Sequence, residues 1–76
     1  MNKGTSPHFV LCVRNTGFRT SLVARKIYRA LPDPDARRRG LLRVVDESGE
    51  DYLFPDTLFV AIALPRAAAR AFDQAG

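Results

Sequence analysis

The 76-residue sequence has one cysteine, one histidine and no tryptophan. With Cys12 alone, an intramolecular disulfide is excluded, so noncovalent contacts hold the fold, as in proteins of a reducing compartment. Cys12 and His8 are four residues apart, which on a strand is about 13 Å and too far for a nucleophile and its base. Glycine-rich phosphate loops, paired metal ligands and triad spacings are missing as well. We therefore expect a non-catalytic protein with no cofactor and no metal.

Long apolar runs are also missing. The longest, Leu58 to Pro65, is far shorter than the roughly 20 residues of a membrane-spanning helix. The N-terminal stretch Met1 to His8 lacks the apolar core of a secretory signal. These absences predict a cytoplasmic protein with no membrane partner. The length suits a single domain, 1–76, with one thin core.

The stretch Leu41 to Pro55 predicts a β-hairpin. Asp46 to Gly49 suits a type I turn, with aspartate at the first position and glycine at the last, where the loop closes on a bulge. The resulting register predicts an apolar core face made by Leu42, Val44, Tyr52 and Phe54. The opposite face is mixed and carries Arg43, Val45, Asp51 and Leu53. We expect the first face to be covered by the core.

Two other apolar stretches are typical of strands. Phe9 to Val13 is rich in strand-forming residues, and Leu58 to Leu64 is apolar throughout, which predicts a last strand buried on both faces. Pro55 to Thr57 interrupts the sheet before that strand, as a turn of 3₁₀ helix would. Residues 1–7 are expected to form a flexible leader, 8–64 a β-barrel and 65–76 a C-terminal helix.

The segment Gly17 to Leu31 allows two interpretations. As a helix, it would be capped by Ser21, would place apolar residues at four-residue spacing and would end before Pro32. As a strand, it would follow an irregular loop from Thr16 to about Ala24, with Tyr28 on one face. Helix propensity favours the first interpretation.

Charge is distributed unevenly along the chain. Ten Lys and Arg but only two Asp occur through Arg43, whereas two Arg and six Asp and Glu follow it. The two parts can attract each other within the fold or between copies, or the basic part can bind a polyanion. The candidate basic surface consists of Arg25, Lys26, Arg29, Arg37, Arg38 and Arg39, the last three in a Pro- and Asp-rich loop or a single helical turn. Such groups can contact a nucleic-acid backbone.

Four carboxylates surround the predicted hairpin turn: Asp46, Glu47, Glu50 and Asp51. We expect a solvated turn, because like charges across a turn repel unless they are hydrated or paired. Two alternatives are a loose Ca²⁺ or Mg²⁺ site, although the spacing fits no EF-hand, and docking with a basic partner such as the arginines of another copy.

The stretch Leu53 to Val60 is similar to the segment of eukaryotic SH3 domains that leads into their last strand. This resemblance implies a mainly β fold, a small SH3-like barrel of about five strands with a short C-terminal helix. The sequence departs from SH3 domains in having no tryptophan and no ALYDY-like aromatic cluster. The resemblance therefore implies the barrel but not the binding of proline-rich ligands.

A second resemblance covers about Gly17 to Pro65. The pattern SL-x-x-x-K-x-Y-x-x-L-P-D begins at Ser21, and R-V-x-D-E-S-G-E-D-Y-L-x-P extends from Arg43 to Pro55. The chain thus resembles a group of small, uncharacterised bacterial proteins, which implies a β-barrel-like domain without an assigned activity. This resemblance favours the strand interpretation of Ile27 to Leu31. We expect a binding or regulatory module that contacts proteins; nucleic-acid binding by the basic segments is the alternative.

Overall fold

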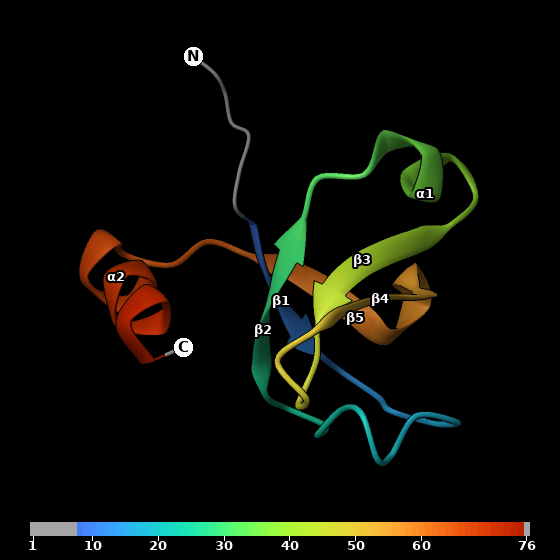
Figure 1. Ribbon diagram of the computed structural model, residues 1–76, viewed down its shortest axis with the longest axis horizontal. Helices are drawn as coiled ribbons and strands as arrows, with labels where there is room; N and C mark the ends of the chain where they lie inside the picture. The colour runs from blue at the N-terminus through green and yellow to red at the C-terminus, as the bar shows by residue number, and fades with distance from the viewer. Residues whose placement is uncertain (1–7, 76) are drawn as a thin grey trace.

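The chain forms one antiparallel sheet of five strands, which two short helices flank (Figure 1). The computed structural model describes residues 8–75. Its elements are β1 (His8–Cys12), β2 (Ile27–Leu31), α1 (Pro34–Arg38), β3 (Leu41–Val45), β4 (Asp51–Pro55), the 3₁₀ turn η1 (Asp56–Leu58), β5 (Phe59–Ile62) and α2 (Arg66–Ala75). The strand order is β4-β3-β2-β1-β5. The mainly β class and the C-terminal helix are confirmed, and the predicted leader lies outside the described residues.

The predicted hairpin is confirmed in both register and turn. Val44 is opposite Tyr52 and Leu42 is opposite Phe54. The Gly49 amide donates to the Asp46 carbonyl at 3.0 Å, which closes the turn. Gly49 has a φ of 86°, a left-handed conformation that only glycine adopts without steric cost. The turn residues thus set the register of the whole ribbon.

The segment that allowed two interpretations forms a strand, β2, preceded by a loop of residues 13–26. Burial alternates along β2, with Tyr28 and Ala30 in the core. This loop contains turns but no helix; in one of the turns the amides of Ser21 and Leu22 both donate to the Phe18 carbonyl. Pairing with β1 on one side and β3 on the other satisfies the backbone of β2, so tertiary pairing overrides the local helix propensity.

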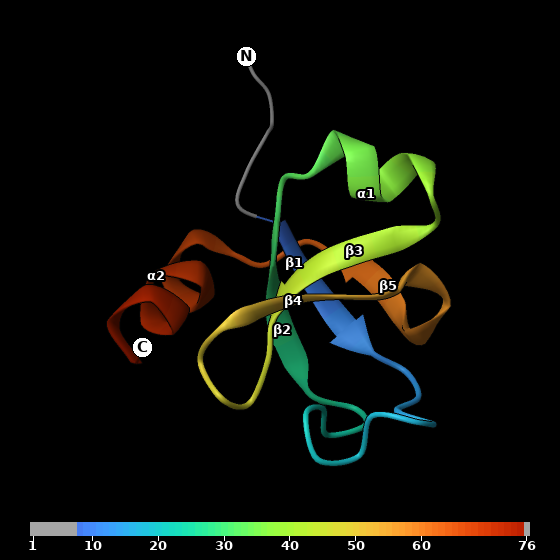
Figure 2. The ribbon, with the colours of Figure 1, turned by 45° about the vertical axis from the view of Figure 1, so that its right-hand side comes forward.

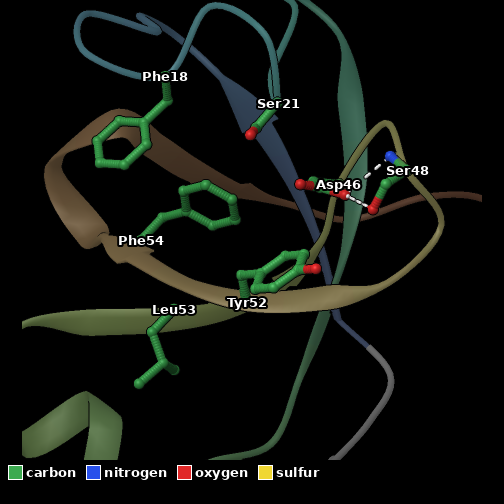
Figure 3. A pocket seen from close by; sticks show the side chains of 7 residues that line it. All are labelled: Phe18, Ser21, Asp46, Ser48, Tyr52, Leu53 and Phe54. Carbon is green, nitrogen blue, oxygen red and sulfur yellow. Dashed lines mark hydrogen bonds between the residues drawn. The ribbon is translucent and has the colours of Figure 1, made fainter.

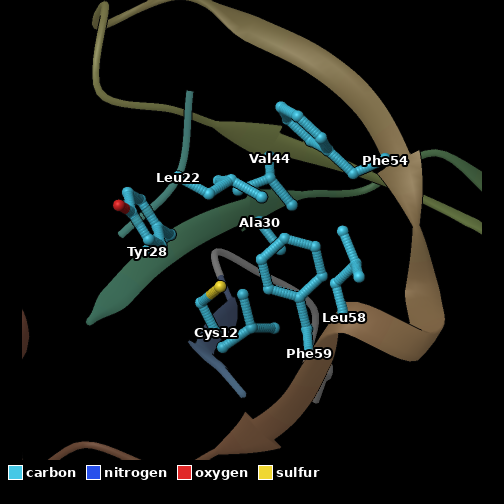
Figure 4. Packing of buried hydrophobic residues seen from close by; sticks show 9 residues of the cluster. Cys12, Leu22, Tyr28, Ala30, Val44, Phe54, Leu58 and Phe59 are labelled. Atoms are coloured by element: carbon cyan, nitrogen blue, oxygen red, sulfur yellow. The ribbon is translucent and has the colours of Figure 1, made fainter. Parts of the chain in front are cut away.

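The core lies on one face of the curved sheet and includes part of the β1–β2 loop (Figure 4). Leu22, from that loop, is completely buried together with Val44 and Cys12. The Phe54 ring lies between two others, with centroids 5.3 Å from Phe18 and 6.2 Å from Phe59. These edge-to-face contacts attach the loop and the last strand to the hairpin.

Helix α1 and helix α2 lie at different sides of the sheet (Figures 1 and 2). Asp33 caps α1 by accepting a hydrogen bond from the Ala36 amide at 3.1 Å, and Pro34 occupies the first turn. Phe72 of α2 packs on Phe9 of β1, with ring centroids 5.1 Å apart. That contact covers Phe9 on the face of the sheet opposite the core.

Two expectations about burial are wrong. The last strand is not buried on both faces, because β5 is an edge strand and Val60 is 51% exposed on its outer side. Tyr52 was expected in the core together with the other apolar residues of the hairpin. It is 49% exposed, because β4 forms the other edge and the core ends at Phe54.

The buried loop residue Leu22 provides a test of this core. Replacing Leu22 with alanine should lower the free energy of unfolding by about 2–5 kcal/mol, since it leaves a cavity under the loop. Val23→Ala is the matched control, because this neighbour is 49% exposed; its effect should stay within about 0.5 kcal/mol. Urea unfolding measures both. Equal effects of the two variants would contradict the placement of the loop in the core.

Candidate functional site

The hairpin tip docks against the β1–β2 loop through Glu47. Its amide donates to the Ser21 carbonyl at 3.0 Å. Its carboxylate oxygen Oε2 lies 2.6 Å from the Lys26 ammonium and also accepts a hydrogen bond from the Tyr28 hydroxyl. We call Lys26, Tyr28 and Glu47 the tip cluster. It joins residues about 20 positions apart in the sequence, so it fixes the loop relative to the hairpin.

Tyr28 links the tip cluster to the loop backbone. Its hydroxyl accepts a hydrogen bond from the Val23 amide at 2.8 Å while it donates to Glu47. Burial and the adjacent carboxylate both raise the pKa of Tyr28, so the hydroxyl keeps its proton. Hydrogen bonds from Lys26 and Tyr28 lower the pKa of Glu47. At neutral pH the cluster is therefore a charge-assisted contact, in which a protonated tyrosine hydroxyl and a lysine donate to an ionised carboxylate.

Asp46 is buried beside this cluster. The residue is 8% exposed, which is unusual for a carboxylate. Its Oδ1 accepts hydrogen bonds from the Ser48 amide at 2.8 Å and from the Ser48 hydroxyl at 2.6 Å. Within residues 8–75, its Oδ2 accepts no hydrogen bond. Figure 3 shows this second oxygen turned away from Ser48, towards the side where Ser21 and Phe54 lie.

A pocket of about 390 Å³ opens next to Asp46 (Figure 3). Its lining comes from the loop, the hairpin tip and β4: Phe18, Ser21, Asp46, Ser48, Tyr52, Leu53 and Phe54. Three of these side chains are aromatic, and two of them, Phe18 and Phe54, contact each other edge to face. The pocket therefore combines aromatic walls with one buried carboxylate, and we call it the tip pocket.

The other tip carboxylates have partners on the hairpin itself. Glu50 accepts a hydrogen bond from the Tyr52 hydroxyl at 3.1 Å, and Asp51 lies 3.5 Å from Arg43. Arg43 also donates to Asp33 at 2.9 Å. The Asp33 pKa is lowered, first by its bond from the Ala36 amide and then by Arg43. The predicted solvated turn is thus wrong for Asp46, which is buried, whereas Glu47 is exposed and is also paired within the chain.

The six basic candidates do not form one surface. Arg25 and Lys26 precede β2, beside the hairpin tip, whereas Arg37 to Arg39 lie in and after α1, at the opposite end of the sheet (Figures 1 and 2). Between them, Arg29 lies over the Phe9 ring at 5.6 Å. Lys26 is paired with Glu47, and Arg38 with Asp35. The structure therefore separates the predicted basic surface into two parts.

Arg37 borders a second pocket of about 360 Å³ near α1. Its floor is apolar, with Val10, Ala30 and Phe59 among the lining residues, and the exposed Asp56 also borders it. Within the described residues, neither Arg37 nor Asp56 forms an ion pair. This pocket therefore has opposite charges at its border and an apolar floor.

Cys12 is completely buried, and burial raises the pKa of its thiol. Since the thiolate is the nucleophile, this environment suits a core residue. Over the part of the chain that the structure describes, no three His, Cys, Asp or Glu side chains are grouped so that they could hold a metal ion. None of the helices within residues 8–75 has the length and apolar character needed to cross a membrane.

No known protein family, characterised protein or solved structure matches this chain. The resemblance to a group of bacterial proteins therefore stays a prediction. Its two stretches nevertheless meet in space. Ser21, Lys26 and Tyr28 of the first contact Glu47 of the second, and Asp33 of the first contacts Arg43 of the second.

Sequence reasoning missed Phe18 and Ser21 as part of a site, and it placed Tyr52 in the core instead. Charge was the only usable signal: a basic first part and an acidic second part suggested attraction within the fold. That signal did not indicate which carboxylate pairs with which cation, since the pairing depends on how the loop crosses the hairpin.

The tip cluster predicts an acid-dependent contribution to stability. Because the pKa of Glu47 is lowered from 4.5, its stabilisation is present above that pH and is lost as pH falls through the folded-state value. Glu47→Gln should therefore lower the free energy of unfolding by about 1 kcal/mol at pH 7 and by progressively less below pH 4.5. Urea unfolding across this range measures the difference. Glu50→Gln is the control; a pH-independent effect of Glu47→Gln would contradict the pairing.

Proposed function

We propose that this protein is a small cytoplasmic, non-catalytic binding or regulatory module that acts through protein contacts at its hairpin tip. The observation that carries the proposal is the tip pocket, with Tyr52 and Leu53 exposed beside it. Exposed aromatic side chains next to a concave surface are typical of protein-binding sites. The strand order and the 3₁₀ turn before β5 support an SH3-like barrel as the scaffold.

The edge position of β4 supports an extended segment as the partner. β4 pairs with β3 on one side and forms the end of the sheet on the other. The unpaired backbone groups of an edge strand can pair with an added strand, while side-chain pockets beside it supply specificity. The tip pocket is in this position, since Tyr52, Leu53 and Phe54 of β4 line it.

This proposal predicts different results for two equally exposed residues. Tyr52→Ser at the tip pocket should remove protein capture from an extract of the native host. Val60→Ser, on the opposite sheet edge and 51% exposed, should leave it intact. Hot-spot aromatic residues typically contribute about 2 kcal/mol or more, roughly a thirtyfold loss of affinity. Capture that both variants retain, or no capture by the wild type, would contradict the proposal.

Nucleic-acid binding is the second candidate, and α1 is the observation that favours it. Arg37, Arg38 and Arg39 are all exposed at one end of the sheet, and Arg38 alone has an acidic partner there among residues 8–75. Mobile cations at an exposed loop can contact phosphates.

This alternative predicts retention on RNA or DNA at low salt that falls steeply as salt rises. The triple variant Arg37→Ala, Arg38→Ala and Arg39→Ala should abolish retention, whereas the Tyr52→Ser variant should not change it. Retention of the triple variant at the wild-type level, or no retention of the wild type at low salt, would exclude this candidate.

A further inference from the structure

We propose that the tip pocket binds an arginine side chain from a basic segment of a partner protein. This inference rests on the proposed function and names the chemistry of its partner. The observation behind it is Asp46, a residue that is 8% exposed and yet has one carboxylate oxygen with no hydrogen bond within residues 8–75.

Asp46 favours a cation as the occupant. Burying a carboxylate is costly unless it is paired and hydrogen-bonded. Ser48 satisfies one oxygen with two hydrogen bonds and fixes the carboxylate orientation. The second oxygen is left on the pocket side (Figure 3). A positively charged N–H donor that enters the pocket would give this second oxygen its hydrogen bond and would pair with the carboxylate charge. The site therefore favours such a donor over a neutral or anionic group.

The aromatic lining favours guanidinium among the cations. A guanidinium is planar and weakly hydrated and stacks on aromatic rings, whereas an ammonium is compact and strongly hydrated. Phe18, Tyr52 and Phe54 line the same pocket as Asp46. Their rings can cover the faces of a guanidinium while one of its edges reaches the carboxylate.

The surroundings of the pocket are acidic and can attract a basic segment. Glu50 is held beside Tyr52 by a hydrogen bond of 3.1 Å, and Asp51, which also pairs with Arg43, follows it at the start of β4. The chain as a whole is basic, with a net charge of +4. The acidic tip is therefore a local exception, and complementary charge would increase the association rate of a basic segment and favour its docking there.

A titration of the full-length ¹⁵N-labelled protein tests this inference. The probe is the capped peptide Ala-Ala-Arg-Ala-Ala at low salt, and the comparison peptide carries norleucine in place of arginine. We expect saturable shifts of the Asp46, Ser48 and Tyr52 amides with the arginine peptide, with a dissociation constant of about 1 mM. The norleucine peptide should bind at least about tenfold more weakly. Equal binding of the two peptides would overturn the inference.

Asp46→Asn is the decisive variant, because asparagine keeps the acceptor for Ser48 and loses the charge. This variant should bind the arginine peptide at least about tenfold more weakly than the wild type does. The matched control, Asp51→Asn at the same tip, should change binding by less than about threefold. Undiminished binding by Asp46→Asn would overturn the inference. If that variant does not fold, Tyr52→Leu provides the test, because it must lower the affinity for the arginine peptide. Wild-type affinity in Tyr52→Leu would likewise overturn the inference.

Two further outcomes separate this inference from the proposed function. If protein capture depends on Tyr52 but the arginine peptide causes no amide shifts, the arginine assignment is overturned, while the proposed protein-binding function stands. The same amides could instead shift with protein concentration in the absence of peptide, and Asp46→Asn could remove these shifts. That result would show that a second copy of this chain occupies the pocket, and it would overturn the assignment of the arginine to a different protein.

Discussion

The contact between Glu47 and the β1–β2 loop determines where a usable surface lies on this small domain. One backbone hydrogen bond to Ser21 and two side-chain bonds, from Lys26 and Tyr28, hold the loop across the hairpin. The loop in turn places Leu22 in the core and Phe18 against Phe54. Because a domain of this size buries little apolar surface, such a contact has a large effect on its shape.

The tip pocket is a consequence of that docking. Phe18 and Ser21 come from the loop, and Asp46 and Ser48 come from the hairpin turn, so the pocket exists only where the two segments meet. The same crossing buries Asp46, which would be hydrated in an isolated hairpin. A structural ion pair and a candidate binding carboxylate thus occur at adjacent positions, 46 and 47, with different roles.

Local patterns in the sequence predicted much of the fold. The Asp46 to Gly49 turn, the register of the hairpin, the 3₁₀ turn and the C-terminal helix all follow from short-range chemistry. Edge positions did not follow, because the strand order depends on pairings between distant segments; Val60 and Tyr52 were therefore predicted to be too buried. The site was predicted only as a group of acidic residues. One of its three aromatic side chains, Phe18, comes from a loop whose path no local pattern predicts, and the other two, Tyr52 and Phe54, come from β4.

Hydrogen exchange of individual amides tests the central claim most directly, because two amide protons report on the docking of the tip. The Glu47 amide is bonded to Ser21, and the Val23 amide to the Tyr28 hydroxyl. Both should exchange more slowly than the amides of the exposed residues Thr16 and Arg19 by about tenfold or more, and both should lose protection together in Glu47→Gln. Exchange of the Glu47 and Val23 amides as fast as that of Thr16 would mean that the tip is a solvated turn, which would contradict the account.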